Sequence, residues 1–309
     1  MTDRVVAASE EAIRRGSKSF AAAARLFDRE TRDDCVMLYA WCRHCDDVID
    51  GQTLGHEQQA DFRTGQRQRL ERLATETNCA LGDGHTDDPT FMALARVARR
   101  AQIPPRHPRE LLAGFAMDVE ARQYRHLEDV LDYSYHVAGV VGVMMAMIMG
   151  ARDEAVLDRA SDLGIAFQLT NIARDIVDDA RAGRVYVPSE ILEPLGIAAI
   201  DPEDRTQWPA LHAAALRLLD VAEPYYASAA AGLAALPWRS AWAIAAARRV
   251  YRAIGQKLRS AGPGAWERRV STGRAQKLGF VALAFLDALL SRFANASPAP
   301  RRGLYQRPR

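Results

Sequence analysis

Leu38-Tyr-Ala-Trp-Cys-Arg43-His-Cys-Asp46-Asp-Val-Ile-Asp50 is the most informative stretch of this sequence, and Gln168-Leu-Thr-Asn-Ile-Ala-Arg174-Asp175-Ile-Val-Asp-Asp179 repeats its pattern further along the chain. Each stretch is largely apolar and carries two aspartates four residues apart. Side chains at i and i+4 lie on one face of an α-helix, a turn apart. The sequence therefore predicts two helices that each present a pair of carboxylates with an arginine close by.

The rest of the sequence favours an all-α fold. Alanine and arginine are abundant, β-branched alternation is scarce, and helical patterns recur without a fixed repeat period. No linker divides the chain, so we expect one helical bundle with a central apolar cavity over residues 1–295 and a flexible basic tail over 296–309. Helices are expected at 9–15, 31–49, 110–124, 130–149 and 154–180, with two or three more up to residue 294.

Charge is distributed unevenly along the chain. Residues 248–309 carry 14 Lys and Arg against Glu267 and Asp287, and the whole chain has a net charge of +2, so the first 247 residues carry −10. A basic C-terminal region suits a phosphorylated substrate or an anionic membrane surface, and it equally suits a solvated helix face. We expect no nucleic-acid partner.

Compartment and membrane signals are few. The N-terminus leads into a polar amphipathic helix rather than an apolar signal, and four cysteines do not suggest a disulfide framework. The longest apolar run, residues 137–149, is too short to cross a bilayer and is typical of a buried core helix. We expect a cytoplasmic protein with peripheral membrane contact.

The paired aspartates indicate a site for divalent cations. Mg²⁺ binds oxygen ligands and commonly takes one or two carboxylates together with substrate phosphates, and arginine binds phosphate through two parallel donors. A metal-bound diphosphate leaves readily, and the carbocation left behind needs a dry pocket. Two alternatives stay open from the residues alone: the aspartates are solvated surface acids, and Tyr133 is an ordinary core aromatic.

Five segments in the same order resemble the head-to-head trans-isoprenyl diphosphate synthases, the family of squalene, dehydrosqualene and phytoene synthases. They are the two aspartate-rich segments with their flanks Tyr39-Ala-Trp-Cys-Arg43 and Gly183-Arg-Val-Tyr-Val-Pro188, together with Gly16-Ser-Lys-Ser-Phe20 and Tyr133-Ser-Tyr-His-Val-Ala-Gly-Val-Val-Gly142. The likeness runs from about residue 16 to 290. Ser134 stands where the family commonly has cysteine. The compact chain and its Leu-Tyr-Gln-Arg-Pro ending most resemble bacterial phytoene synthases.

The resemblance implies a role for each matching position. Asp46, Asp50, Asn171, Asp175 and Asp179 are expected to bind Mg²⁺ or Mn²⁺, and Tyr133 to lie near the reacting carbons. Diphosphate contacts or the shaping of their sites are expected from Ser17, Lys18, Ser19, Tyr39, Arg43, Gln168, Asn171, Arg174, Tyr186 and Tyr251.

The implied reaction is a metal-dependent prenyl transfer in carotenoid biosynthesis. Two molecules of geranylgeranyl diphosphate condense through a cyclopropylcarbinyl diphosphate to phytoene, without NADPH, and contact with other enzymes of the pathway is expected. The nearest alternative is a C30 dehydrosqualene or squalene synthase that uses farnesyl diphosphate. From a different class, a catalytically silent helical adaptor remains an alternative, although all four motif aspartates are present.

Overall fold

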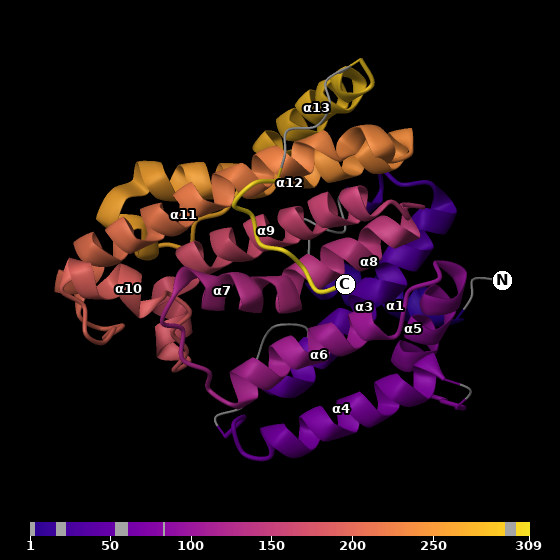
Figure 1. Ribbon diagram of the computed structural model, residues 1–309, viewed down its shortest axis with the longest axis horizontal. Helices are drawn as coiled ribbons and strands as arrows, with labels where there is room; N and C mark the ends of the chain where they lie inside the picture. The colour runs from indigo at the N-terminus through magenta and orange to yellow at the C-terminus, as the bar shows by residue number, and fades with distance from the viewer. Residues whose placement is uncertain (1–3, 17–22, 53–60, 83, 294–300) are drawn as a thin grey trace.

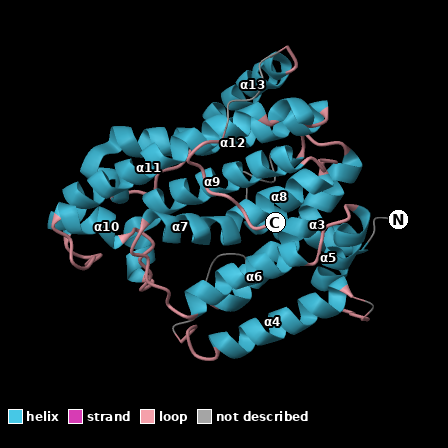
Figure 2. Ribbon diagram, viewed as in Figure 1, coloured by secondary structure: helices cyan, strands magenta, loops and turns pink. Residues whose placement is uncertain are grey.

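The computed structural model describes residues 4–16, 23–52, 61–82, 84–293 and 301–309, and these residues form helices and loops with no strand among them (Figure 2). The all-α expectation is confirmed. The longer helices are α1 (Arg4–Gly16), α3 (Arg29–Asp50), α4 (Gln66–Leu81), α5 (Pro89–Arg100), α6 (Arg106–Val119), α7 (Leu127–Ser134), α8 (Val140–Ile148), α9 (Glu154–Arg181), α11 (Trp208–Ala231), α12 (Trp238–Ala261) and α13 (Arg274–Ser291).

Helix α9 lies at the centre of the bundle, between α11 and α12 on one side and α7 and α8 on the other (Figure 1). The Asp153 side chain accepts the backbone N–H of Ala155 and so caps the first turn. The observed bounds match the predicted range 154–180 within a residue. Most of the helix is buried. The pair of aspartates near its C-terminal end is therefore carried by a largely buried helix at the centre of the bundle.

Helix α3 carries the other pair of aspartates at its own C-terminal end. Its N-terminus is capped by Asp28, whose side chain accepts the N–H of Thr31. Gly51 ends the helix in the left-handed conformation, with φ of 58°, as the Asp50-Gly51 sequence predicts. The expected end of this helix is thus confirmed.

The apolar segment 130–149 belongs to a longer helical run that contains one wide turn. Helices α7 and α8 are joined without a break by a π-helical turn, Tyr135–Gly139. The combined run, Leu127–Ile148, is long and apolar enough to cross a membrane by length and composition alone, but 61% of its most apolar window is buried inside the bundle. It is a core helix in this fold, in agreement with the sequence prediction.

Two glycines let this run cross α9 at very short range. A Cβ on Gly142 would lie 2.3 Å from the carbonyl oxygen of Ala160, and a Cβ on Gly164 would lie 2.2 Å from that of Ala138. Both obstacles are backbone atoms that cannot rotate away. Only glycine allows the two helices to approach this closely.

The C-terminal residues contradict the predicted flexible tail over residues 301–309. Arg307 is fully buried and donates to Asp158 at 2.8 Å, and Arg301 forms a bidentate pair with Asp162 at 2.7 Å for both bonds. The Tyr305 hydroxyl donates to Asp132 at 2.9 Å. These acids project from α7 and from the first half of α9, so the basic end of the chain is held against the bundle by complementary charge.

Two smaller expectations also differ from the structure. The helix expected over 110–124 begins earlier and ends at Val119. The loop expected between residues 183 and 209 contains short helical turns, among them α10 (Ser189–Leu192). All four cysteines are free thiols, as the sequence suggests.

Candidate active site

A cavity of about 620 Å³ lies between α3, α6, α8, α9 and α12. It gathers every predicted site residue that the structure describes, including both aspartate pairs and residues as far apart in sequence as Tyr39 and Tyr251. Ser17, Lys18 and Ser19 lie outside the described residues. The predicted residues that line the cavity are Tyr39, Arg43, Asp46, Asp50, Tyr133, Gln168, Asn171, Arg174, Asp175, Asp179, Tyr186 and Tyr251.

The α3 pair of aspartates is held by two arginines. Arg43, one turn before Asp46, donates to its carboxylate at 2.6 Å. Arg184 follows α9 in the sequence and reaches across to form a bidentate pair with Asp50, one of whose bonds measures 3.1 Å. Burial raises the pKa of Asp46 to about 7, against the opposing charge of Arg43 and with the repulsion of Asp50.

The two aspartates of α9 are also buried, but their pKa values are shifted in opposite directions. Asp175 accepts hydrogen bonds from Arg174, at 2.8 Å, and from Arg269, at 2.9 Å. Burial acts to raise the pKa of Asp175, but these two guanidinium groups outweigh it and leave the pKa below its usual value. For Asp179, burial and the neighbouring Asp175 charge raise the pKa to about 8. One carboxylate of this pair is already neutralised by arginine, and the other is poised to gain a cation.

A cluster of tyrosines surrounds a third carboxylate. Tyr133 donates to Asp118 at 3.0 Å and Tyr186 donates to its other oxygen at 2.8 Å. The two phenol rings stack with their centroids 4.8 Å apart, and Tyr124 packs edge-on against Tyr133. Burial raises the pKa of Asp118, which Arg184 and the two hydroxyls partly offset. The Tyr133 hydroxyl is therefore held at the cavity wall by a hydrogen bond to a carboxylate.

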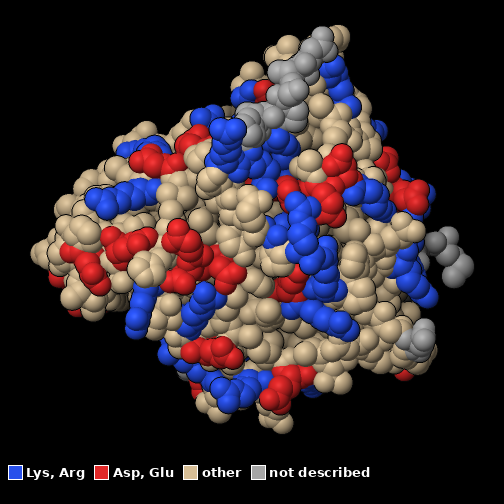
Figure 3. All heavy atoms as spheres, viewed as in Figure 1, with Lys and Arg blue, Asp and Glu red and all other residues tan. Residues whose placement is uncertain are grey.

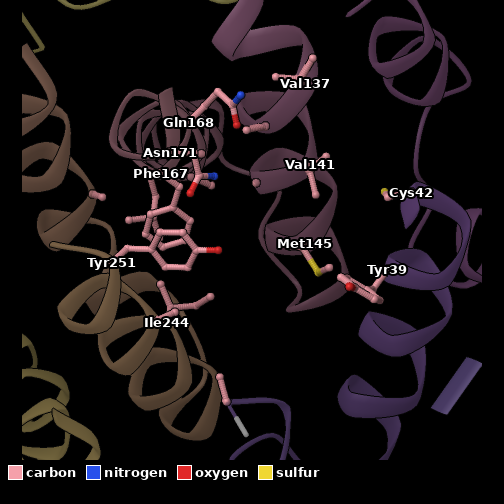
Figure 4. A pocket seen from close by; sticks show the side chains of 18 of the residues that line it. Tyr39, Cys42, Val137, Val141, Met145, Phe167, Gln168, Asn171, Ile244 and Tyr251 are labelled. Carbon is pink, nitrogen blue, oxygen red and sulfur yellow. The ribbon is translucent and has the colours of Figure 1, made fainter. Parts of the chain in front are cut away.

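The remainder of the cavity is mainly apolar, with Arg159 and Lys277 as its charged exceptions (Figure 4). Val137, Val141 and Met145 project from one wall, with Phe167 and Ile244 opposite them. The Phe167 ring stacks on Tyr251, with the ring centroids 4.0 Å apart. The cavity thus combines a charged end, built from α3 and α9, with a mainly hydrocarbon-lined interior.

The donor set fits divalent cations held jointly with a phosphorylated ligand. Among the described residues, no three His, Cys, Asp or Glu side chains are grouped as a finished metal site. Arginines hold Asp46, Asp50 and Asp175 instead. Because Mg²⁺ needs only one or two protein carboxylates when phosphate oxygens complete its shell, this arrangement is compatible with cations that arrive together with a diphosphate. The raised pKa of Asp179 supports this, since a nearby cation would relieve its buried charge.

Three residues of this site, Asp118, Arg184 and Arg269, were not predicted from the sequence. Arg184 lies in the segment Gly183–Pro188 that resembles the family, but no role was predicted for it. Asp118 carries a readable signal, since Leu111, Phe115 and Asp118 follow helical spacing and place an acid on an apolar stripe that faces the cavity. Arg269 lies in the loop after α12 and pairs with Asp175 over 94 positions of sequence, which no local pattern indicates.

Known proteins resemble this chain in sequence and in fold. A family model described as squalene/phytoene synthase matches residues 13–276. A 15-cis-phytoene synthase from a Paracoccus species is 55% identical over 309 residues, covering 100% of this chain and 99% of the relative. That of Pantoea ananas is 53% identical, covering 95% and 94%. Among solved structures, a dehydrosqualene synthase in complex with a ligand matches with a TM-score of 0.81 at 24% identity, covering 91% and 95%, and it shows the shared fold.

Proposed function

Because this chain belongs to the squalene/phytoene synthase family of metal-dependent prenyltransferases, we propose that it is a phytoene synthase that joins two molecules of geranylgeranyl diphosphate. The observation that carries the proposal is the cavity itself. Carboxylate pairs from α3 and α9 line its charged end beside four arginines, and its interior is apolar. Curated relatives that match over nearly their whole length bear the name phytoene synthase, which favours the C40 product over the C30 alternative.

Residues at the charged end bind and orient the diphosphates. Mg²⁺ or Mn²⁺, held by Asp46, Asp50, Asn171, Asp175 and Asp179, would neutralise the charge that develops on the leaving diphosphate. In this proposal Arg43, Arg174 and Arg184 turn from the aspartates toward phosphate oxygens when cations arrive, because guanidinium groups bind either anion in the same bidentate way. Tyr39, Gln168 and Tyr251 shape the two diphosphate sites.

The apolar walls hold the hydrocarbon chains, and the tyrosine cluster lies where carbon–carbon bonds form and protons are lost. Ionisation of one substrate gives an allylic cation, to which a double bond of the second substrate donates its electron pair, and loss of a proton then closes a cyclopropane ring. The cyclopropylcarbinyl diphosphate then ionises, rearranges and loses a second proton to give phytoene, with two diphosphates released. We assign Tyr133 as a proton relay, whose oxygen takes a proton from carbon while its own proton passes to Asp118. Tyr186 holds Asp118 in place.

Substrate and product are lipids, so we further propose a cytoplasmic enzyme with peripheral membrane contact. The remaining basic residues of the region 248–309 motivate this through their attraction to anionic headgroups, since Arg301 and Arg307 are already paired with acids of the bundle. Contact with other enzymes of carotenoid synthesis would pass the hydrocarbon on without exposing it to water.

The test is one incubation of purified protein with geranylgeranyl diphosphate and Mg²⁺, without NADPH, followed by extraction and mass analysis. We expect phytoene, and no product when EDTA is present. Replacing Mg²⁺ by Mn²⁺ tests the second metal. Product from farnesyl diphosphate alone would replace this proposal with the C30 alternative, and no hydrocarbon from either substrate would leave the adaptor alternative.

Variants of the aspartates test the site itself. Asp46→Asn and Asp175→Asn are expected to abolish turnover while the protein stays folded. Asp178→Asn is the matched control, because this aspartate lies on the same helix, is 57% exposed and pairs with Arg181 outside the cavity. If Asp46→Asn and Asp175→Asn kept the same activity as Asp178→Asn and the natural protein, the metal assignment would be wrong.

A further inference from the structure

Exposed apolar side chains concentrate on one helix. Among the described residues, nine large hydrophobic side chains are classed as exposed, and six of them lie on α13, with a seventh, Phe293, two residues beyond its end. Leu278 is 72% exposed and Leu290 is 65% exposed. Monomeric proteins rarely expose a contiguous apolar surface of this kind, and where they do it commonly marks an interaction site.

The helix is firmly attached on one side, so its exposure is a property of the folded protein. Ala284 and Ala288 are fully buried against α12. The Trp242 indole donates to the carbonyl of Val281 at 2.8 Å, and its ring packs edge-on against Phe285. Figure 1 shows α13 over α12 at the margin of the molecule, on the side away from α4 and α6. Ala284, Ala288 and one face of Phe285 thus contact α12, whereas Leu278, Leu286 and Leu290 stay exposed.

The charges on and around this helix favour an anionic surface. The single acid of α13, Asp287, is held by Arg249 in a bidentate pair at 2.5 and 2.6 Å. Arg274 and Lys277 lie at its first turns and Arg292 directly after its end. Figure 3 shows basic side chains gathered over the region of α12 and the base of α13. A helix with apolar sides and basic ends is suited to the boundary between headgroups and acyl chains.

The same helix forms part of the cavity wall. Lys277 and Val281 line the cavity beside Ile244 and Tyr251 of α12. The apolar interior of the site therefore extends to the helix that carries the exposed apolar surface. A membrane in contact with α13 would lie next to this wall.

We propose that α13 is the membrane-docking helix of this protein, and that it seats the cavity wall against an anionic lipid bilayer. Leu278, Leu286, Leu290 and Phe293 enter the acyl region, while Arg274 contacts headgroup phosphates. The hydrocarbon product then leaves beside Val281 directly into lipid, where it gains the full transfer free energy of its apolar surface. This inference rests on the proposed function only for the nature of the product.

The test is co-sedimentation of the full-length protein, without substrate, with vesicles of equal phosphatidylcholine and phosphatidylglycerol. We expect binding that weakens on pure phosphatidylcholine vesicles and in high salt. Leu286→Glu with Leu290→Glu is expected to lower the bound fraction by roughly tenfold or more, because two charges replace apolar contacts in the acyl region. Met92→Glu, at an exposed apolar position on α5, is the matched control and is expected to bind as the natural protein does.

Activity in detergent micelles separates docking from catalysis. Neither Leu286 nor Leu290 lines the cavity, so the double variant is expected to make phytoene in detergent at the natural rate. Vesicle binding that is absent, or unchanged in the double variant, would overturn the docking inference while leaving the proposed function intact. A third outcome would favour a second copy of this chain as the partner of α13. In that case light scattering would find a dimer for the natural protein and a monomer for the double variant, with no vesicle binding by either.

Discussion

Gly164 lies where α9 crosses the π turn, and we expect Gly164→Ala to destabilise the protein and to impair the site. The added Cβ would lie 2.2 Å from the carbonyl oxygen of Ala138 and 2.7 Å from the Cα of Gly139. The helices would have to separate by about 1 Å to restore ordinary contact. Overpacking typically costs 1–3 kcal/mol, and because both obstacles are backbone atoms we expect about 3 kcal/mol.

For a chain of this length, about 3 kcal/mol corresponds to a fall in Tm of roughly 5 °C. A displacement of about 1 Å next to Tyr133 is expected to lower kcat roughly 10²-fold. The assays are thermal unfolding followed by circular dichroism and phytoene formation from geranylgeranyl diphosphate.

Gly279→Ala supplies the control, because this glycine lies inside α13 with no atom within 4 Å of the added Cβ. Alanine there is expected to raise stability by about 0.5–1 kcal/mol through its better helix propensity. If Gly164→Ala matched the natural protein in both Tm and kcat, the close crossing would not constrain the site and the reasoning would be wrong.

Three further predictions concern charged groups. Asp118→Asn is expected to lower kcat at least about tenfold with little change in KM, because the amide cannot take up the relayed proton, and a parallel rise in KM would point instead to a role in binding. Arg307→Ala is expected to cost about 3 kcal/mol in urea unfolding, since it removes the buried partner of the buried Asp158, whereas Arg309→Ala at the exposed end of the same network is expected to cost less than about 1 kcal/mol. Equal losses would contradict the structure of the tail. In the metal-free protein, Asp46 and Asp179 have pKa values raised to about 7 and about 8, so their contribution to stability is lost as pH rises through these values. Mg²⁺ must displace the same protons, and its affinity, measured by calorimetry, is expected to rise between pH 6 and pH 8; a flat profile would count against both assignments.

The fold class and the two aspartate pairs of the site could be predicted from the sequence, because both depend on local patterns. Asp175 and Asp179 follow helical spacing within an apolar stretch, so their common face is fixed once the helix forms. Their approach to α3 does not follow from the spacing; it was predicted from the chemistry that the two motifs share, and the family resemblance added to it.

The residues that were missed depend on long-range pairing. Arg269 meets Asp175, and Arg301 meets Asp162 over 139 positions, only after the bundle has assembled. Composition alone made residues 301–309 look loosely ordered, because a basic, proline-containing stretch is typical of tails. The acids that hold it are distributed along other helices, where each one looks like an ordinary surface charge.

The wide turn at Tyr135–Gly139 has a consequence for which sequence lengths this family member can tolerate. Each residue of an α-helix advances by about 100°, so side chains four apart drift by about 40° per step around the axis. Tyr133, Val137, Val141 and Met145 nevertheless all line one cavity. A π turn takes back part of this drift, in effect adding one residue to the turn. The π turn thus sets the rotation between Tyr133 and the residues of α8. Deleting a single residue between 135 and 139 would rotate Tyr133 off the cavity wall even though Tyr133 itself is kept.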